Sequence, residues 1–242
     1  MSIYVMSDVH GLKDRYDAMM EKLIKEEDTL YVLGDVVDRG PDGIAILQDL
    51  MRRPNVYMLL GNHEYMMMQY YQVVHKELEE PLDGWTIMDR WNRNGCHPTI
   101  AQFEALTLQE QDEILEYIAD LPLAYAEVKV NDALYYLVHG CPQLAFDKGI
   151  ITRDQAIANG STVENFVWDR IQEDTPLFED RCVITGHTPT VFLQKNRPFQ
   201  IWSKDPDLNK TKLIDIDCGC AAASADSQLA VFCLDDHSVF YF

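Results

Sequence analysis

The sequence predicts an α/β fold whose parallel strands present polar side chains at one edge of a sheet. Asp35 lies 27 residues after Asp8 and 27 residues before Asn62, and each of the three follows an apolar run. A strand, a helix and the return to the next strand need about 30 residues. Because binding residues gather at the carboxyl ends of parallel strands, we expect these three clusters to meet at one sheet edge.

Three apolar runs predict the parallel strands, and amphipathic stretches predict the helices between them. Apolar residues recur at helical spacing from Leu12 to Leu23. Pro41 is expected at the first position of the next helix, because its fixed φ suits a helix start. A third helix is expected from Tyr65 to about His75, with a methionine-rich stripe that we interpret as core. The strands are expected at Ile3 to Met6, Thr29 to Leu33 and Val56 to Leu60.

The second half of the chain predicts a helical block followed by short strands. From Glu77 to Asp120 the pattern is mainly helical, with a capping box from Thr107 to Glu110. Two strands joined at Asn131-Asp132 are predicted to form a hairpin that ends at His139. Residues 142–181 give no clear pattern, and the C-terminal strands are expected to form an antiparallel region. The expected strands are Ala124 to Val130, Ala133 to Val138, Cys182 to Thr185, Leu213 to Ile216, Leu229 to Leu234 and Ser238 to Phe242.

Length and charge limit the class of protein and its partners. The 242 residues, 47% apolar and 25% charged, predict one compact domain over residues 1–242. Forty acidic against twenty basic residues give a formal charge of −20, which would repel long nucleic acids. No apolar stretch is long enough to cross a membrane, and no obligate protein partner is indicated.

The cysteines and the N-terminus indicate a reducing compartment. The six cysteines show neither a disulfide framework nor zinc-ligand spacing, so we interpret them as reduced thiols. The first residues lack the basic and apolar regions of a secretion signal, and we therefore expect a cytoplasmic protein. Cys218 and Cys220 are interpreted as small residues buried at a strand end. Cys141 would act as a redox modulator only if it were exposed.

Six oxygen and imidazole donors follow apolar runs and together predict a site for two divalent metal ions. The set contains carboxylate, amide and imidazole groups but no thiolate, which favours manganese, with iron and zinc as alternatives. Asp35 is central enough to bridge two ions, and such a pair supplies a hydroxide nucleophile at neutral pH. The predicted ligands are Asp8, His10, Asp35, Asn62, His139 and His187.

Two divalent ions would leave the pocket with a net positive charge, which would attract a phosphoryl group. Four further residues have predicted roles at that group. Arg39 and Arg170 offer planar, bidentate contacts to phosphoryl oxygens. His63 directly follows the predicted ligand Asn62 and is predicted to be the general acid. Asp38 is predicted to orient His63 and to keep it protonated.

These motifs resemble those of one known family. The chain is similar to phosphoprotein-phosphatase-type metallophosphoesterases of the calcineurin-like superfamily, and most similar to their phage and bacterial branch. The resemblance implies a β-sandwich of two sheets flanked by helices. Cys141 departs from it, because the family often has a second glycine there. The family motifs are Asp8-Val9-His10-Gly11, Gly34-Asp35-Val36-Val37-Asp38-Arg39-Gly40, Gly61-Asn62-His63-Glu64, His139-Gly140 and Gly186-His187. The likeness to the phage and bacterial branch rests on Glu64-Tyr65-Met66-Met67, Trp91-Asn92-Arg93-Asn94-Gly95 and Trp168-Asp169-Arg170.

The resemblance also implies which residue serves which part of the site. It implies a first ion on Asp8, His10 and Asp35 and a second ion on Asp35, Asn62, His139 and His187. It implies that Arg39, His63 and Arg170 contact the substrate phosphate. Asn62 is predicted as a further substrate-binding residue beside Arg39 and Arg170.

Three functions remain open at the level of the sequence. The first is a serine/threonine protein phosphatase that hydrolyses a phosphoprotein or a small phosphorylated substrate by attack of a metal-bridging hydroxide. The alternative is a dinucleoside polyphosphate hydrolase acting on diadenosine tetraphosphate. Asp38 argues against it, because the symmetrical hydrolases of this kind tend to lack an acid at that position. A second alternative is a non-catalytic interaction module, although this chain retains all six predicted ligands.

Overall fold

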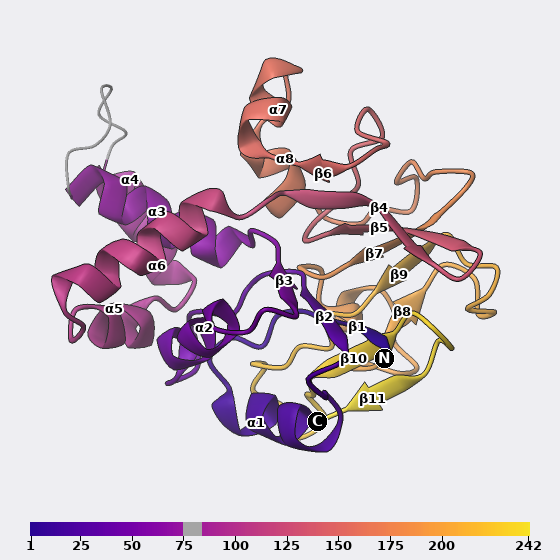
Figure 1. Cartoon of the computed structure of the whole chain (residues 1–242), viewed down its shortest axis with the longest axis horizontal. Helices are drawn as coiled ribbons and strands as arrows, with labels where there is room; N and C mark the ends of the chain where they lie inside the picture. Colours follow the sequence, from indigo (N-terminus) through magenta and orange to yellow (C-terminus); the bar gives the residue numbers. More distant parts are fainter. Residues whose placement is uncertain (75–83) are drawn as a thin grey trace.

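The computed structural model describes residues 1–74 and 84–242, which form two β-sheets with helices outside them (Figure 1). The first sheet contains β1 (Ile3–Met6), β2 (Thr29–Val32), β3 (Val56–Met58), β10 (Ala230–Cys233) and β11 (Val239–Tyr241). The second contains β4 (Ala124–Val130), β5 (Ala133–Val138), β6 (Ile150–Ile151), β7 (Cys182–Thr185), β8 (Trp202–Ser203) and β9 (Leu213–Asp215). The strand orders are β11-β10-β1-β2-β3 and β6-β4-β5-β7-β9-β8.

The first three strands are parallel neighbours, as the sequence predicts. Met6 pairs with Val32 and Val32 with Met58, so the three strands end side by side. The sheet as a whole is mixed, because β10 runs antiparallel to β1. The three loops that leave these parallel strands therefore start from one edge.

The two sheets pack face to face through a shared apolar core. Val5 and Phe232 of the first sheet cluster with Leu137, Ile184 and Ile214 of the second. Alternate residues of a strand point to opposite faces. The neighbours of Val5 in β1, Tyr4 and Met6, accordingly belong to the other core, under the helices. This arrangement is the predicted two-sheet sandwich flanked by helices.

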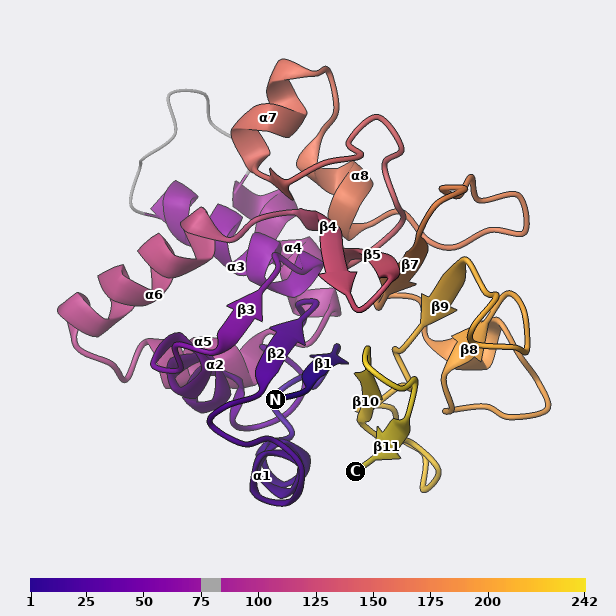
Figure 2. The same ribbon diagram turned by 45° about the vertical axis from the view of Figure 1, so that its right-hand side comes forward.

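The helices cover the outer sides of the sandwich (Figures 1 and 2). In both views, α1 and α2 lie beside β1 and β2, and α3 to α6 gather at one side of the molecule. Within the described ranges, no helix is long and apolar enough to cross a bilayer. The helices are α1 (Lys13–Lys22), α2 (Gly43–Met51), α3 (Asn62–Val74), α4 (Gly84–Arg93), α5 (His97–Phe103), α6 (Leu108–Asp120), α7 (Arg153–Ala158), α8 (Val163–Val167) and the 3₁₀ helix η1 (Thr190–Phe192).

Two predicted helix starts are wrong. Helix α2 begins at Gly43, because the Asp42 N–H donates to Gly11 O at 3.1 Å and holds Pro41 in the preceding loop. Helix α3 begins at Asn62, three residues before the predicted start. Residues 75–83, on which parts of the predicted helices fall, lie outside the described residues. The capping box of α6 is confirmed, since Thr107 and Glu110 make both of its hydrogen bonds.

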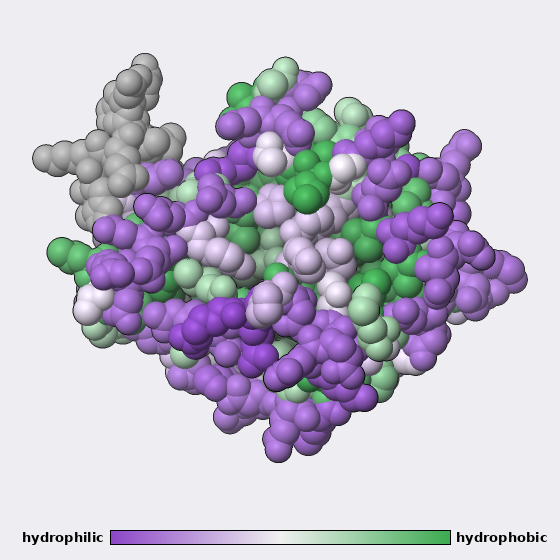
Figure 3. Space-filling model, in the orientation of Figure 1, coloured by the Kyte–Doolittle hydropathy of each residue, from purple (hydrophilic) through white to green (hydrophobic). Residues whose placement is uncertain are grey.

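The C-terminal strands do not form one antiparallel region. Strand β9 belongs to the second sheet and runs parallel to β7, whereas β10 and β11 pair in the first sheet. Residues 142–181, which gave no pattern, contain β6, α7 and α8. The surface over these elements mixes hydrophilic and hydrophobic residues (Figure 3), and Ile150 of β6 and Ile157 of α7 are both exposed.

Candidate metal centre

Three polar loops meet at the edge where the parallel strands end. Asp8 follows β1, Asp35 follows β2, and Asn62 opens α3 after β3. Hydrogen bonds join the first two loops: the His10 N–H donates to Asp35 O at 3.0 Å, and the Asp8 N–H donates to Gly34 O at 3.1 Å. The clusters that recur along the sequence are therefore neighbours in space.

The backbone of these loops adopts left-handed conformations that aim side chains inward. The φ angles of Asp8, Asp35 and His187 are 57°, 57° and 64°. Such conformations cost about 1 kcal/mol or more for non-glycine residues and cluster at functional sites. Gly34 has φ 108°, and a Cβ there would lie 2.6 Å from Gly61 Cα. Only glycine therefore lets the loops after β2 and β3 approach so closely.

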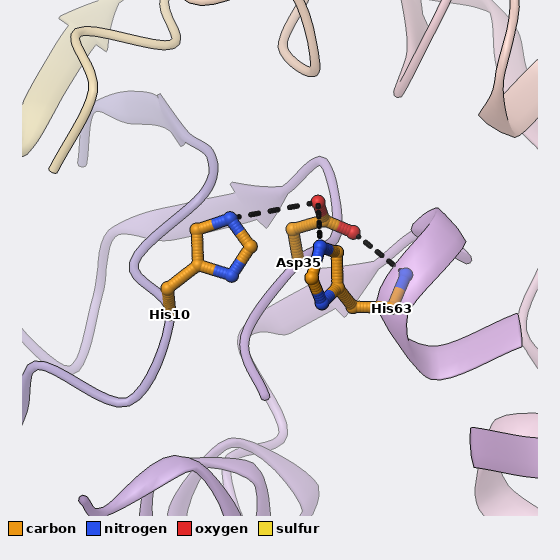
Figure 4. Close-up of side chains that lie close together, drawn as sticks. All are labelled: His10, Asp35 and His63. Atoms are coloured by element: carbon orange, nitrogen blue, oxygen red, sulfur yellow. Dashed lines mark hydrogen bonds and ion pairs between the residues drawn. The ribbon is translucent and has the colours of Figure 1, made fainter. Parts of the chain in front are cut away.

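Asp35 occupies the centre of the site. Its Oδ2 lies 3.6 Å from His10 Nε2 and 3.7 Å from His63 Nε2, as Figure 4 shows. Its Oδ1 lies 3.3 Å from His139 Nε2. All four side chains are buried. The two oxygens thus face two groups of imidazoles, which is the arrangement a carboxylate needs to bridge two ions.

Two groups of possible metal ligands share Asp35, and in each the ligand atoms lie within 4.8 Å of one another. The groups are His10, Asp35 and His63, and Asp35, His139 and His187. Asn62 Oδ1 lies 3.0 Å from His139 Nε2, and Asp8 Oδ1 lies 3.8 Å from His10 Nε2. All six predicted ligands therefore gather here, and His63 borders the first group as well.

The imidazoles are oriented by hydrogen bonds to backbone carbonyl oxygens. One ring N–H of each donates, which leaves the other nitrogen free to bind a metal ion. His10 Nε2 is buried and has no hydrogen-bond partner among the described residues. A buried lone pair beside two carboxylates fits a divalent cation. The three contacts are His10 Nδ1 to Val37 O at 3.0 Å, His139 Nδ1 to Leu33 O at 2.9 Å and His187 Nε2 to Trp168 O at 3.1 Å.

Burial and mutual charge set the protonation of these groups. Burial raises the pKa of Asp35, but His139 and His63 outweigh it and hold the pKa well below its usual value. Burial lowers the pKa of His139, but Asp35 outweighs it and raises the pKa to about 9. Burial and His63 lower the pKa of His10, and burial and His139 lower that of His187 to about 3. His10 and His187 are therefore neutral at pH 7, as ligands must be.

Asp8 is a buried carboxylate that a nearby cation would stabilise. Its Oδ2 accepts hydrogen bonds from Ser7 Oγ at 2.5 Å and from the His187 N–H at 3.1 Å. Burial, followed by the charge of Asp35, raises its pKa. Two carboxylates confined together in this way match a site for positive charge.

Three residues predicted to act on the phosphoryl group are in contact. His63 Nδ1 lies 2.6 Å from Asp38 Oδ2, and Arg39 Nη2 lies 3.1 Å from His63 Nε2. Burial lowers the pKa of His63, but Asp35 and Asp38 outweigh it and raise the pKa overall. A protonated His63 and Arg39 repel each other, and an anionic oxygen that accepts from both would relieve this repulsion.

Arg170 lies at the rim of the site. Its Nη1 donates to His187 O at 2.8 Å, while the residue itself is exposed. A cavity of about 570 Å³ adjoins it, lined in part by Gln143, Asp169 and Thr175. The guanidinium is thus anchored beside the predicted ligand His187, with an open cavity next to it.

Sequence reasoning missed the structural role of Glu64. Its carboxylate accepts hydrogen bonds from the backbone N–H groups of Asp35, Val36, Val37 and Gly61, at distances from 2.8 to 3.2 Å. Burial and then Asp35 raise its pKa to about 7, while the backbone N–H donors lower it. Glu64 is the third residue of α3, where acidic side chains accept backbone N–H groups. Because the sequence pattern predicts the start of this helix at Tyr65, it misses this position.

All six cysteines are free thiols, as predicted. Cys218 and Cys220 are buried near the end of β9, which agrees with their interpretation as small buried residues. Cys141 is also buried, and burial followed by Asp169 raises its pKa to about 12. Its thiol is therefore protonated at pH 7, and it lacks the exposure that a redox role requires.

The sequence and this geometry match one protein family. A profile of the calcineurin-like phosphoesterases matches residues 1–216. The chain therefore belongs to this family of metal-dependent phosphoester hydrolases, and the donor set around Asp35 agrees with the pair of metal ions typical of it.

The curated relatives are dinucleotide hydrolases that match only part of the chain. The symmetrical bis(5'-nucleosyl)-tetraphosphatase of Wigglesworthia glossinidia brevipalpis is 32% identical over 84 residues, which are 33% of this chain and 30% of that protein. The enzyme of the same name from Delftia acidovorans is 25% identical over 142 residues, which are 57% of this chain and 44% of that protein. The matches thus span less than half the length of these relatives.

Solved structures share the fold across the whole chain. A protein serine/threonine phosphatase from Saccharomyces cerevisiae has a TM-score of 0.61 at 15% identity, covering 100% of this chain and 79% of that chain. A putative diadenosine tetraphosphatase has a TM-score of 0.52 at 14% identity, covering 99% and 92%. At these identities the likeness shows a common fold and leaves the substrate open.

Proposed function

We propose that this protein hydrolyses phosphate monoesters of alcohols, with phosphoserine and phosphothreonine in proteins as its substrates. Two divalent ions, with manganese favoured by a donor set without thiolate, would lower the pKa of a water molecule so that hydroxide is available at neutral pH. One ion would be held by Asp8, His10 and Asp35, and the other by Asp35, Asn62, His139 and His187.

The substrate phosphate would be held by cationic and amide side chains around the site. Arg39 and Arg170 each present a planar pair of N–H donors, which matches two phosphoryl oxygens at once. Arg170 is anchored on the carbonyl oxygen of His187, so its position relative to the metal site is fixed. Asn62, at the start of α3, would add an amide donor on the same side.

The observation that carries the proposal is the 2.6 Å contact between His63 Nδ1 and Asp38 Oδ2. Nδ1–H donates to the carboxylate, so in the protonated ring the second proton lies on Nε2, the nitrogen beside Arg39 Nη2. In the proposed reaction this proton would pass to the leaving oxygen of a phosphate held by Arg39. A serine or threonine alkoxide is a strong base that must take up a proton as the P–O bond breaks. A nucleoside phosphate is a much weaker base and needs that proton far less. A buried, acid-paired histidine is therefore most useful to an enzyme for alkyl phosphates.

A second candidate is the hydrolysis of diadenosine tetraphosphate. It is favoured by the curated relatives, whose names specify symmetrical cleavage of such dinucleotides. The carboxylate–histidine pair argues against it, because a nucleoside phosphate leaves with little need for a proton donor. The net charge of −20 disfavours long nucleic acids as substrates under either candidate.

Substrate competition tests the proposal. Protein stripped of metal and reconstituted with Mn²⁺ is assayed on a phosphoserine peptide, a phosphothreonine peptide and diadenosine tetraphosphate. We expect kcat/KM for the peptides to exceed that for the dinucleotide by at least about tenfold, or about 1.4 kcal/mol in the transition state. The reverse ratio would establish the dinucleotide candidate, and no hydrolysis of any phosphoester would favour a non-catalytic module.

A variant of His63 tests the general acid separately. His63→Asn is expected to lower kcat on the phosphoserine peptide by about a hundredfold. It should spare p-nitrophenyl phosphate, whose leaving group needs little protonation. His97→Asn is the matched control, because His97 is exposed at the start of α5. An equal loss on both substrates would remove His63 from the role of proton donor.

A further inference from the structure

The loop that carries Asp38 and Arg39 is held from outside the sandwich by the α4–α5 segment. The Asp38 N–H donates to Thr99 Oγ1 at 2.8 Å, and the Arg39 N–H donates to Gly95 O at 3.0 Å. Asp38 and Arg39 have φ angles of 71° and 65°, which are unfavourable for residues with a side chain. Both strained residues are therefore tied by hydrogen bonds to the same helical segment.

Trp91 of α4 makes the contact that reaches the carboxylate itself. Its indole Nε1–H donates to Asp38 Oδ2 at 2.7 Å, the same oxygen that accepts from His63 Nδ1. Asp38 Oδ1 is buried and has no hydrogen-bond partner in the part of the chain that the structure describes. The rotation of this carboxylate is thus set by two donors on one oxygen, one from His63 and one from Trp91.

Packing alone does not account for an indole at this position. Trp91 is fully buried against Tyr70 and Tyr71, with ring centroids 5.3 and 6.1 Å away. A phenylalanine would serve that contact. The indole adds an N–H group, and a buried N–H requires an acceptor. Here the acceptor is the carboxylate that orients the proton donor.

We propose that Trp91 is a positioning residue for proton donation, because its indole N–H fixes the Asp38 carboxylate against which His63 is aligned. The inference rests on the proposed function, in which His63 Nε2–H donates its proton to the leaving alkoxide oxygen as the P–O bond breaks. Trp91 is neither a predicted metal ligand nor a predicted phosphate-binding residue, and its hydrogen bond goes to Asp38. Its effect should therefore appear only where the leaving group needs a proton.

The test compares leaving groups in variants that remove the indole N–H. Trp91→Phe keeps an aromatic ring but has no donor. In the Mn²⁺-loaded protein it should lower kcat on a phosphoserine peptide by about tenfold, a typical loss for a group that orients a catalytic one. It should leave kcat on p-nitrophenyl phosphate within about twofold and leave KM for the peptide and the bound manganese unchanged. Phe103→Leu on α5 is the packing control, since Phe103 is buried against Tyr71 and should not change the ratio of the two rates.

A second variant covers the case in which Trp91→Phe does not fold. Site-specific replacement of Trp91 by benzothienylalanine substitutes sulfur for the N–H and keeps the shape of the ring, and it should give the same selective loss. Equal losses on the alkyl and aryl substrates, or no loss on either, would overturn the proposal.

His63→Asn in parallel separates the role of Trp91 from the proposed function. If His63→Asn lowers kcat on the phosphoserine peptide more than on p-nitrophenyl phosphate but the Trp91 variants do not, only the role of Trp91 is wrong. If His63→Asn lowers both rates equally, the proposed function is wrong as well.

Discussion

Glu64 Oε2 accepts a hydrogen bond from the backbone N–H of Asp35 at 2.9 Å, so the first turn of α3 holds the loop that carries this central predicted ligand. The other oxygen, Oε1, accepts from Val36 and Val37 at 2.8 and 3.1 Å. One buried carboxylate thereby satisfies three successive N–H groups of a loop whose residue Asp35 has a left-handed φ of 57°. The geometry of the metal centre depends on this carboxylate although no metal need touch it.

Glu64→Gln should destabilise the protein and disorganise the site. A carboxamide has a single acceptor oxygen, so its NH₂ group would face backbone N–H donors and leave them unsatisfied. We expect a loss of about 3 kcal/mol in the free energy of unfolding, the upper range for buried hydrogen bonds to a charged group. Urea unfolding of the metal-free protein measures it. Glu110→Gln is the matched control, because Glu110 is also the third residue of a helix but is only partly buried. A urea midpoint for Glu64→Gln that is no lower than that of Glu110→Gln would contradict the role of Glu64 in holding the Asp35 loop.

The parallel strands and the ligand clusters were predictable because their signals are local. An apolar run followed by a polar turn identifies a strand end, and the equal intervals between Asp8, Asp35 and Asn62 indicate neighbouring strands. The hairpin of β4 and β5 and strand β7 were predicted with their observed bounds for the same reason. Local pattern and spacing were therefore sufficient to locate these strands and the edge where their loops meet.

Features that depend on distant contacts were not predictable. Pro41 carries a helix-start signal, but the bond from the Asp42 N–H to Gly11 O delays the helix by two residues. The pairing of β9 with β7 and of β10 with β1 depends on the packing of the two sheets, which no local pattern contains. The contact between Trp91 and Asp38 spans 53 residues and was likewise hidden.

Gly34→Ala should be far more destabilising than an alanine at a comparable exposed glycine. A Cβ at Gly34 would lie 2.6 Å from Gly61 Cα, in addition to the strain of φ 108°. We expect a loss of at least about 3 kcal/mol, from left-handed strain together with backbone overlap. Gly149→Ala is the control, because its φ is 76° but a Cβ would meet no atom within 4 Å. It should cost only about 1 kcal/mol. Equal shifts in urea midpoints would show that backbone conformation alone, without the close approach, decides the cost.

Manganese binding should release protons and tighten as pH rises. Burial opposes protonation of His139, but Asp35 raises its pKa to about 9, so this imidazole is protonated in the metal-free protein at pH 7. A ligand histidine must be neutral, so binding displaces that proton and affinity increases from about pH 6 to about pH 9. Calorimetry in buffers of different ionisation enthalpy measures the release, which His139→Gln should reduce. Heats that do not depend on the buffer would show that His139 does not bind the ion or is already neutral.

Arg170→Lys should weaken substrate binding more than it slows turnover. Lysine keeps the charge but loses the planar pair of donors and the hydrogen bond from Nη1 to His187 O. We expect KM for a phosphoserine peptide to rise by about tenfold, with kcat falling less. Steady-state kinetics with Mn²⁺-loaded protein resolve the two constants. A drop in kcat alone would indicate that Arg170 acts only in the transition state.

Asp38→Asn should move the pH dependence of turnover to lower pH. Burial disfavours the protonated ring of His63, and the Asp35 and Asp38 carboxylates raise its pKa against that effect. Removing one carboxylate therefore lowers the pKa of His63. The protonated ring is the active form of a general acid, so activity is lost as pH rises through this pKa, and in the variant the loss should begin at lower pH.

We expect kcat of Asp38→Asn on a phosphoserine peptide to be reduced at neutral pH and partly restored on acidification. Profiles from about pH 5.5 to about pH 9 measure the shift, with p-nitrophenyl phosphate as the insensitive control. A basic limb at the same pH in both proteins would mean that another group controls it, and the assignment of His63 as proton donor would have to be withdrawn.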